Sequence, residues 1–226
     1  MSGRPHAILI ADDHPLFRSA LKQIISAAYP DSQILEAADI PAVQQCLAQS
    51  LPIDLVLLDL HMPGAHGYSA LAFITGHHSV SPVIMVSANN HPETMRRALD
   101  YGAAGFLSKS ASVELMQCTI AKVMAGEIVA PDAVHQAQRG ADINSLDVSD
   151  AVASLTPQQF RVASMLVEGL LNKQIAYELD VTEATIKAHM TEIFKKLGVH
   201  SRTQAVLALN SLALESPMEL VAPPPI

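Results

Sequence analysis

Short apolar runs alternate with amphipathic stretches over the first 125 residues of the chain. The apolar runs predict five β-strands, at residues 7–11, 33–36, 55–59, 83–87 and 105–108. Between and after them, apolar residues at helical spacing predict helices at 15–28, 40–49, 67–76, 92–101 and 112–125. This alternation predicts a doubly wound, five-stranded parallel sheet with helices on both faces, in the flavodoxin-like strand order 2-1-3-4-5.

A different pattern begins after residue 126. Residues 127–153 are acidic and weakly periodic, which predicts a linker with room for a short helix at 132–138. Thr156, Pro157 and Gln159 then form a capping-box pattern that starts a helix. Four amphipathic helices are predicted, at 157–168, 172–179, 183–197 and 202–212. The predicted organisation is a domain at 1–126, the linker, an all-α four-helix domain at 154–212, and a proline-rich tail at 213–226 that we expect to be disordered.

Composition and charge narrow the class of protein. The chain has 14 Lys+Arg against 22 Asp+Glu, a net charge of −8, which argues against a general polyanion binder. Residues 155–210 form the only segment without an acidic excess, at net +1. Cys46 and Cys118 lie in apolar helical patterns and are expected to be reduced, buried thiols. No signal peptide and no apolar run of about 20 residues is present, so we expect a cytoplasmic protein without a membrane partner.

Polar side chains follow four of the predicted strands at the point where each strand ends. Asp12 and Asp13 follow the first strand, Asp59 ends the third, Ser87 ends the fourth and Lys109 follows the fifth. Taken singly, each is as well explained by a turn, a helix cap or a solvated group. Because the carboxyl ends of neighbouring parallel strands meet at one edge of the sheet, we expect them to share one pocket.

These residue types point to phosphoryl chemistry. Three carboxylates in one pocket repel each other unless a cation joins them, and oxygen ligands suit Mg²⁺. A lysine and a hydroxyl opposite the carboxylates hold the remaining oxygens of a phosphoryl group. The pocket therefore predicts phosphoryl transfer onto Asp59. The nearby His14, His61 and His66 lack the ligand spacing of a zinc site, so no transition metal is expected.

The first domain carries four specific runs: ADDHPLFRSAL, DLVLLDLHMPG, VIMVSA and GAAGFLSKS. Over residues 7–125 they resemble the receiver domain of bacterial two-component response regulators. The resemblance implies that Asp59 is the phosphoacceptor. It also implies a Mg²⁺ site made by Asp12, Asp13, Asp59 and the backbone carbonyl of His61.

The same resemblance assigns three residues around the phosphoryl group. Ser87 would be the switch hydroxyl, and Lys109 the phosphate-contacting lysine. Phe106 would be the switch aromatic, which lacks the hydroxyl of the more common tyrosine but keeps the ring that swings inward.

The second domain contains two predicted helices joined by a short turn at 180–182. Apolar residues of the second of these helices recur at spacings of 3, 4 and 7, which leaves a polar face with small and basic side chains. Such a face fits the major groove of DNA, although a plain helical bundle with a solvated face has the same pattern. The runs NKQIA, TEATIKAH and KLGVHSR resemble the LuxR-type helix-turn-helix domain of the NarL/FixJ subfamily. The resemblance implies DNA contacts by Lys173, Thr185, Lys187, Ala188, Thr191 and Lys195.

We therefore interpret the chain as a DNA-binding response regulator. A partner sensor histidine kinase would phosphorylate Asp59, and phosphorylation would control binding to double-stranded promoter DNA and transcription. The receiver is expected to catalyse only its own phosphorylation and dephosphorylation. A homodimer on activation is expected, with Val206 and Leu209 as a contact between DNA-bound copies, and a contact with RNA polymerase is a further expectation.

Two alternatives come from other classes. A Mg²⁺-dependent phosphohydrolase of the haloacid-dehalogenase type would use an Asp nucleophile, but it needs a second Asp two residues later, where His61 stands. In the other alternative, the helical domain docks a protein instead of DNA. DNA binding by residues 150–226 alone would separate that alternative from ours.

Overall fold

The computed structural model describes residues 6–213 except 50, 78–80, 132–133 and 135–142. Its sheet is parallel in every strand pair and has the order β2-β1-β3-β4-β5. The strands are β1 Ala7–Ala11, β2 Gln33–Ala37, β3 Leu55–Asp59, β4 Val83–Ser87 and β5 Gly105–Ser108. The predicted fold class and strand order are confirmed, and only β2 differs in length, by one residue.

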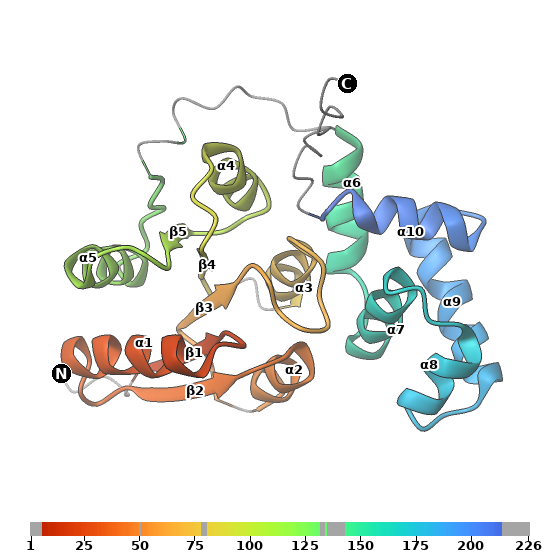
Figure 1. Cartoon of the computed structure of the whole chain (residues 1–226), viewed down its shortest axis with the longest axis horizontal. Coiled ribbons are helices and arrows are strands. Elements are labelled where there is room, and N and C mark those ends of the chain that lie inside the picture. The colour runs from red at the N-terminus through yellow and green to blue at the C-terminus, as the bar shows by residue number, and fades with distance from the viewer. Residues whose placement is uncertain (1–5, 50, 78–80, 132–133, 135–142, 214–226) are drawn as a thin grey trace, which may run out of the picture.

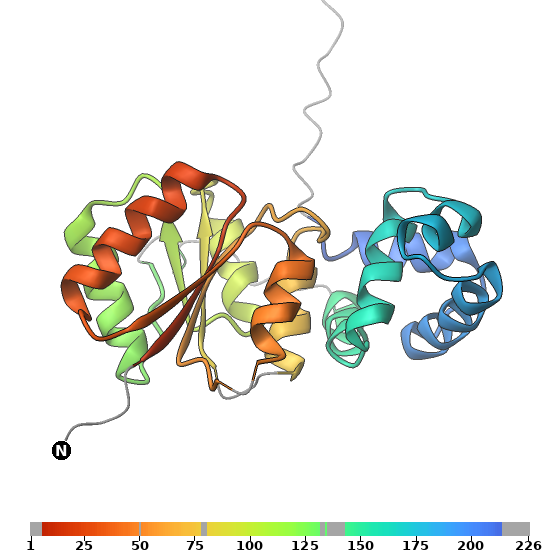
Figure 2. The same cartoon turned by 90° about the horizontal axis from the view of Figure 1, so that it is seen from below.

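Five helices cover the two faces of this sheet. Figures 1 and 2 show α1 and α5 on one face and α2 and α3 on the other, where α4 also packs. Each layer has its own apolar cluster, because the buried strands present aliphatic side chains to both faces. The helices are α1 Pro15–Ala28, α2 Ile40–Leu47, α3 Ser69–His77, α4 Pro92–Asp100 and α5 Val113–Met124.

The central strand β3 determines where the predicted phosphoacceptor lies. Its four apolar residues, Leu55–Leu58, are fully buried, and Asp59 follows them directly. A carboxylate any deeper in this strand would be buried without a partner, at a large desolvation cost. The end of the apolar run therefore places Asp59 at the carboxyl edge of the sheet, where it pairs in register with Val86 of β4.

The second domain is helical, as predicted. Its helices are α7 Pro157–Val167, α8 Asn172–Glu178, α9 Glu183–Leu197 and α10 Arg202–Asn210. They close over a small apolar core that includes Phe160, Leu166, Ile175, Ile186 and Ile193. None of the helices within the described ranges is long and apolar enough to cross a membrane.

One helix was not predicted. Residues Ile143–Ala153 form α6, so the interpretation of this stretch as part of a linker is wrong. The helix is weakly amphipathic on its own, and tertiary packing of Val148 and Val152 stabilises it. The predicted short helix at 132–138 lies outside the described residues except for 134, and the tail lies outside them except for 213.

The prediction for the two thiols is half correct. Cys46 in α2 is buried and Cys118 in α5 is exposed, and both are free cysteines. The apolar pattern around Cys118 misled the prediction, because this residue is two positions from both Met116 and Ile120 and so lies on the opposite side of α5 from the buried stripe that they form.

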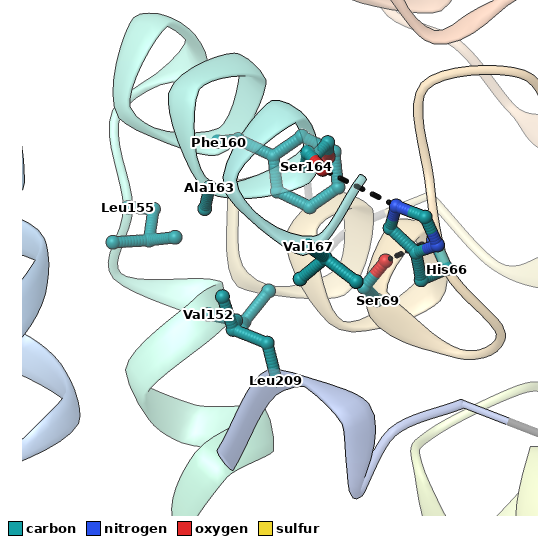
Figure 3. Close-up of a pocket in the computed structure, with 9 residues that line it drawn as sticks. All are labelled: His66, Ser69, Val152, Leu155, Phe160, Ala163, Ser164, Val167 and Leu209. Atoms are coloured by element: carbon teal, nitrogen blue, oxygen red, sulfur yellow. Dashed lines mark hydrogen bonds between the residues drawn. The ribbon is translucent and has the colours of Figure 1, made fainter. Parts of the chain in front are cut away.

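The two domains pack closely against one another. Helix α6 packs across α3 (Figure 1), and a Cβ added to Gly76 of α3 would lie 2.5 Å from the Cβ of Ala153. The rings of Phe73 and Phe160 are 4.6 Å apart across the interface. Figure 3 shows a cavity between the domains of about 10 Å³, lined by His66, Ser69, Val152, Leu155, Phe160, Ala163, Ser164, Val167 and Leu209. That volume holds about one water molecule, so the packing around this cavity is nearly complete. A second, more open pocket of about 220 Å³ also lies between the domains and is lined by Gln44, Leu47, Ala48, Phe73, His77 and Pro157.

The start of α7 has the capping box that the sequence predicts. Thr156 Oγ1 accepts a hydrogen bond from the Gln159 N–H at 3.2 Å, and Gln159 Oε1 accepts one from the Thr156 N–H at 3.1 Å. Lys196 of α9 donates to the same Gln159 oxygen at 2.8 Å. The cap at the start of α7 is therefore also bonded to α9, through Lys196.

We expect Thr156→Ala to lower the free energy of unfolding of this domain by about 1 kcal/mol, because an orphan N–H loses its acceptor. Urea unfolding followed by circular dichroism measures the change. Thr156→Ser keeps the hydroxyl and serves as the control, and equal loss in both variants would contradict the role of the cap.

Candidate functional site

Three predicted site residues and the neighbouring His14 lie together at the carboxyl edge of the sheet. Ligand atoms of Asp12, Asp13, His14 and Asp59 all lie within 4.8 Å of one another. Asp12 and Asp59 are only 1% and 2% exposed, while Asp13 is partly exposed. The structure thus brings together the carboxylates that the sequence predicts to share a pocket.

Lys109 pairs with both buried carboxylates. Its Nζ lies 2.8 Å from Asp12 Oδ2 and 3.0 Å from Asp59 Oδ2. Burial alone would lower the pKa of Lys109, but its hydrogen bonds and charge interactions with Asp12 and Asp59 outweigh burial and raise the pKa above its usual value. The ammonium is therefore charged at neutral pH and lies between the residue predicted to receive phosphate and one predicted to hold the metal.

The loop after β1 is fixed by two further residues. The His14 N–H donates to Asp12 Oδ1 at 2.8 Å, and His14 Nδ1 lies 2.5 Å from Asp13 Oδ1. His14 therefore holds the acidic loop in place. Arg18, which the sequence analysis missed, donates to the backbone carbonyl of Asp12 at 2.6 Å. Arg18 lies in the first turn of α1, shortly after the acidic pair along the chain. A basic residue at this position is the sequence signal that would have found it.

The donor set fits a hard divalent cation. Asp12 Oδ2 and Asp59 Oδ2 are buried and, apart from the Lys109 ammonium, lack a hydrogen-bond partner among the described residues. Buried carboxylate oxygens with this spare capacity are the ligands that Mg²⁺ prefers. His61, whose carbonyl was predicted as a ligand, lies two residues after Asp59 and has an exposed side chain.

The other predicted phosphate contacts lie on the neighbouring strands. Ser87 is fully buried at the end of β4, and its Oγ accepts a hydrogen bond from the Asn89 N–H at 3.0 Å. The Lys109 N–H donates to the Ser87 carbonyl at 2.8 Å, so the two strand ends are tied together. Phe106 is only 3% exposed, so its ring is already inside and needs no inward swing to become buried.

The predicted DNA-contacting residues lie on the surface of α8 and α9. Thr185 is partly exposed, and the other five are exposed: Lys173, Lys187, Ala188, Thr191 and Lys195. Helix α9 buries Ile186, Met190 and Ile193 on its opposite face, as the apolar spacing predicts. Figures 1 and 2 both show α6 and α7 next to the receiver and α8 and α9 farther out, so the receiver leaves this polar face open.

The turn between α8 and α9 has the local features of a helix-turn-helix. Asp180 has a φ of +50°, which reverses the chain after α8. Thr182 then caps α9, since its side chain accepts from the Thr185 N–H, and Gly198 ends the helix in a left-handed conformation.

Two family models match the chain, one over each domain. The model of the response regulator receiver domain matches residues 8–121, and that of bacterial regulatory proteins of the luxR family matches residues 153–209. The first match contains the acidic pocket, and the second contains α8 and α9.

Related proteins cover nearly the whole chain. A glycerol metabolism activator from Pseudomonas putida is 36% identical over 212 residues, which are 92% of this chain and 96% of that protein. The nitrate/nitrite response regulator protein NarL from Escherichia coli is 35% identical over 204 residues, which are 90% of this chain and 94% of that protein. Solved structures of the RcsB response regulator share the fold. One from Salmonella typhimurium has a TM-score of 0.55 and 22% identity, and it covers 92% of this chain and 100% of its own.

A parallel α/β domain with a buried aspartate pocket, joined to a helix-turn-helix, defines a response regulator with a DNA-binding output. The chain belongs to the NarL/FixJ subfamily of two-component response regulators. It is a phosphorylation-controlled, DNA-binding regulator of transcription.

We expect Mg²⁺ to stabilise the receiver through the acidic pocket. At ten to a hundred times its Kd, a ligand that binds only the folded state adds about 1.4–2.7 kcal/mol to the free energy of unfolding. Thermal unfolding with and without MgCl₂ measures this shift. Asp12→Asn should abolish it and Asp31→Asn, outside the pocket, should not. A full shift in Asp12→Asn would contradict the metal assignment.

Proposed function

We propose that Asp59 accepts a phosphoryl group from a phosphohistidine of a sensor kinase. The observation that carries this proposal is the Lys109 ammonium between the buried carboxylates of Asp12 and Asp59. Asp59 lies at a strand end with the Lys109 ammonium beside it. This arrangement suits a reaction in which negative charge develops at Asp59.

The transfer step uses the chain's own groups. A carboxylate oxygen of Asp59 attacks phosphorus, the phosphorus–nitrogen bond breaks, and the leaving imidazole nitrogen takes a proton. Lys109 then pairs with the phosphoryl oxygens, while the Ser87 hydroxyl donates to another of them. Mg²⁺ held by Asp12, Asp13, Asp59 and the His61 carbonyl would supply charge neutralisation during transfer. Hydrolysis of the acyl phosphate in the same pocket would end the signal.

Acetyl phosphate with Mg²⁺ should add a single phosphoryl group to the full chain, and intact mass spectrometry should detect it. Asp59→Asn removes the attacking oxygen and should abolish the product. Asp54→Asn, at the other end of β3, is the matched control and should remain phosphorylated. Persistent modification of Asp59→Asn at one other residue would contradict the assignment.

We propose that α9 enters the major groove of promoter DNA. Lys187, Ala188 and Thr191 lie on its exposed face and would contact bases or phosphates, with Thr185 beside them. Lys173 at the start of α8 and Lys195 near the end of α9 would contact the DNA backbone. Lys196 is unsuited to this role because it donates to Ser154 and Gln159 inside the domain.

Lys187→Ala should weaken DNA binding by about 1–3 kcal/mol if this lysine reads a base. If it contacts a phosphate, the slope of log affinity against log salt should fall by about one. Fluorescence anisotropy over a salt series measures both. Lys122→Ala, an exposed lysine of the receiver helix α5, is the control. Unchanged affinity and slope would mean that α9 is misassigned.

The near-neutral charge of the second domain supports action as a dimer. Six basic groups against five acidic ones in residues 155–210 allow few phosphate contacts, so one copy should bind weakly. Two linked copies on two half-sites gain affinity because the second contact is intramolecular.

We propose a homodimer on activation, a cytoplasmic location with the DNA, and a contact with RNA polymerase at promoters. We also propose domain limits of 1–126 and 154–212, with α6 added to the second domain.

A further inference from the structure

His14 lies at the rim of the acidic pocket, and one of its ring nitrogens is close to three charged groups. His14 Nδ1 is 2.5 Å from Asp13 Oδ1, 3.3 Å from Asp12 Oδ1 and 3.5 Å from Lys109 Nζ. The side chain is 65% exposed, so the ring reaches the pocket from the solvent side. The pocket therefore offers an imidazole nitrogen in addition to its carboxylate oxygens.

A hydrogen bond does not explain the contact between His14 and Asp13. Asp13 Oδ1 is buried and has no hydrogen-bond partner among the described residues, although His14 Nδ1 lies 2.5 Å from it. The two atoms are close without the alignment that a hydrogen bond requires. A carboxylate oxygen and the lone pair of a neutral imidazole repel each other at this distance, and a cation that binds both removes the repulsion.

The spacing of the polar atoms fits a single metal ion. In an octahedral site with bonds of about 2.1 Å, adjacent ligand atoms lie about 3.0 Å apart and opposite ones about 4.2 Å apart. The distances from His14 Nδ1 to the two carboxylates, 2.5 and 3.3 Å, lie on either side of the value for adjacent ligands. Asp12, Asp13, His14 and Asp59 each offer one atom within 4.8 Å of the others, which is close to the value for opposite ligands.

The histidines near the pocket do not form a site with one another, in agreement with their spacing in the sequence. His66 Nε2 contacts the carbonyl of Ser164 in the second domain, at 3.3 Å, and the side chain of His61 is exposed. His14 is the one that lies among the carboxylates. The expectation that no transition metal binds rests on the spacing between histidines, which does not address one histidine within a cluster of carboxylates.

An imidazole ligand changes which ion a carboxylate pocket prefers. Mg²⁺ binds oxygen ligands, whereas imidazole nitrogen suits first-row transition ions. Mn²⁺ accepts the same carboxylate and carbonyl oxygens as Mg²⁺, so it is the transition ion that best matches a pocket with mostly oxygen ligands.

We propose that His14 Nδ1 is a direct ligand of the ion in this pocket and makes the receiver select Mn²⁺ over Mg²⁺. The proposal deepens the proposed function, because it rests on the acidic pocket as the metal site for phosphoryl transfer to Asp59. It assigns His14 two separate roles. The backbone N–H orders the loop through Asp12, and the side chain determines the choice of metal.

The first test identifies the ligands of bound Mn²⁺ in the unphosphorylated full chain, so it does not depend on phosphoryl transfer. Pulsed electron paramagnetic resonance of Mn²⁺ detects a nitrogen atom bound directly to the ion. We expect a nitrogen signal in the wild type and its loss in His14→Gln. This variant keeps the backbone N–H that bonds to Asp12, and its amide offers an oxygen in place of the nitrogen.

Metal selectivity gives a second readout. The Kd of Mn²⁺ follows from the loss of the free-ion resonance during titration, and the Kd of Mg²⁺ follows from competition with Mn²⁺. The preference for Mn²⁺ over Mg²⁺ should fall about tenfold in His14→Gln, mainly through weaker Mn²⁺ binding. His66→Gln is the matched control and should keep both the nitrogen signal and the preference, because that ring contacts the second domain.

The outcomes separate this inference from the proposed function. Bound Mn²⁺ without a nitrogen signal, a signal that persists in His14→Gln, or an unchanged preference in that variant would overturn His14 as a ligand and leave the carboxylate site standing. Asp12→Asn should abolish binding of both ions. Failure of the wild type to bind either ion would overturn the inference and the proposed metal site together.

Discussion

The structure depends on the burial of negative charge at one edge of a parallel sheet. Asp12 and Asp59 are almost wholly enclosed, and one lysine ammonium lies between them. Burying two carboxylates with a single cation leaves a net negative charge in a region of low dielectric, which is costly unless another cation joins. That net negative charge favours the binding of Mg²⁺. It also makes the pocket sensitive to a phosphoryl group, which adds further negative charge.

The pocket and the DNA-binding domain are linked through short segments. The loop from Asp59 to Tyr68 runs from the pocket to the domain interface, and α4 lies beside it. On the other side, α3 packs on α6 with no room for a side chain at Gly76. A contact as tight as the one between α3 and α6 cannot absorb small shifts gradually. A movement in the pocket that reached α3 would therefore also move the second domain.

The sequence predicts the local features well and the long-range features poorly. Apolar runs predict the strand ends at Asp59 and Ser87, and a capping pattern predicts the cap at Thr156. Neighbouring residues determine all of these features. Helix α6 was missed because packing against α3, rather than its own periodicity, stabilises it. The hydrogen bonds from Arg97 to the Ser211 carbonyl and from the Tyr68 N–H to the Leu212 carbonyl gave no sequence signal. The partners in each pair lie more than a hundred residues apart along the chain and meet only when the domains are docked.

The central claim is that phosphorylation of the proposed acceptor Asp59 controls the second domain, whose C-terminal end contacts the receiver just after α10. Amide hydrogen exchange at Tyr68, whose N–H donates to the Leu212 carbonyl, measures this docking directly. We expect protection of this amide in the unmodified chain and faster exchange after addition of beryllofluoride and Mg²⁺, with no change in Asp59→Asn. Equal protection of Tyr68 before and after activation of the wild-type chain, while the pocket amides respond, would contradict the account.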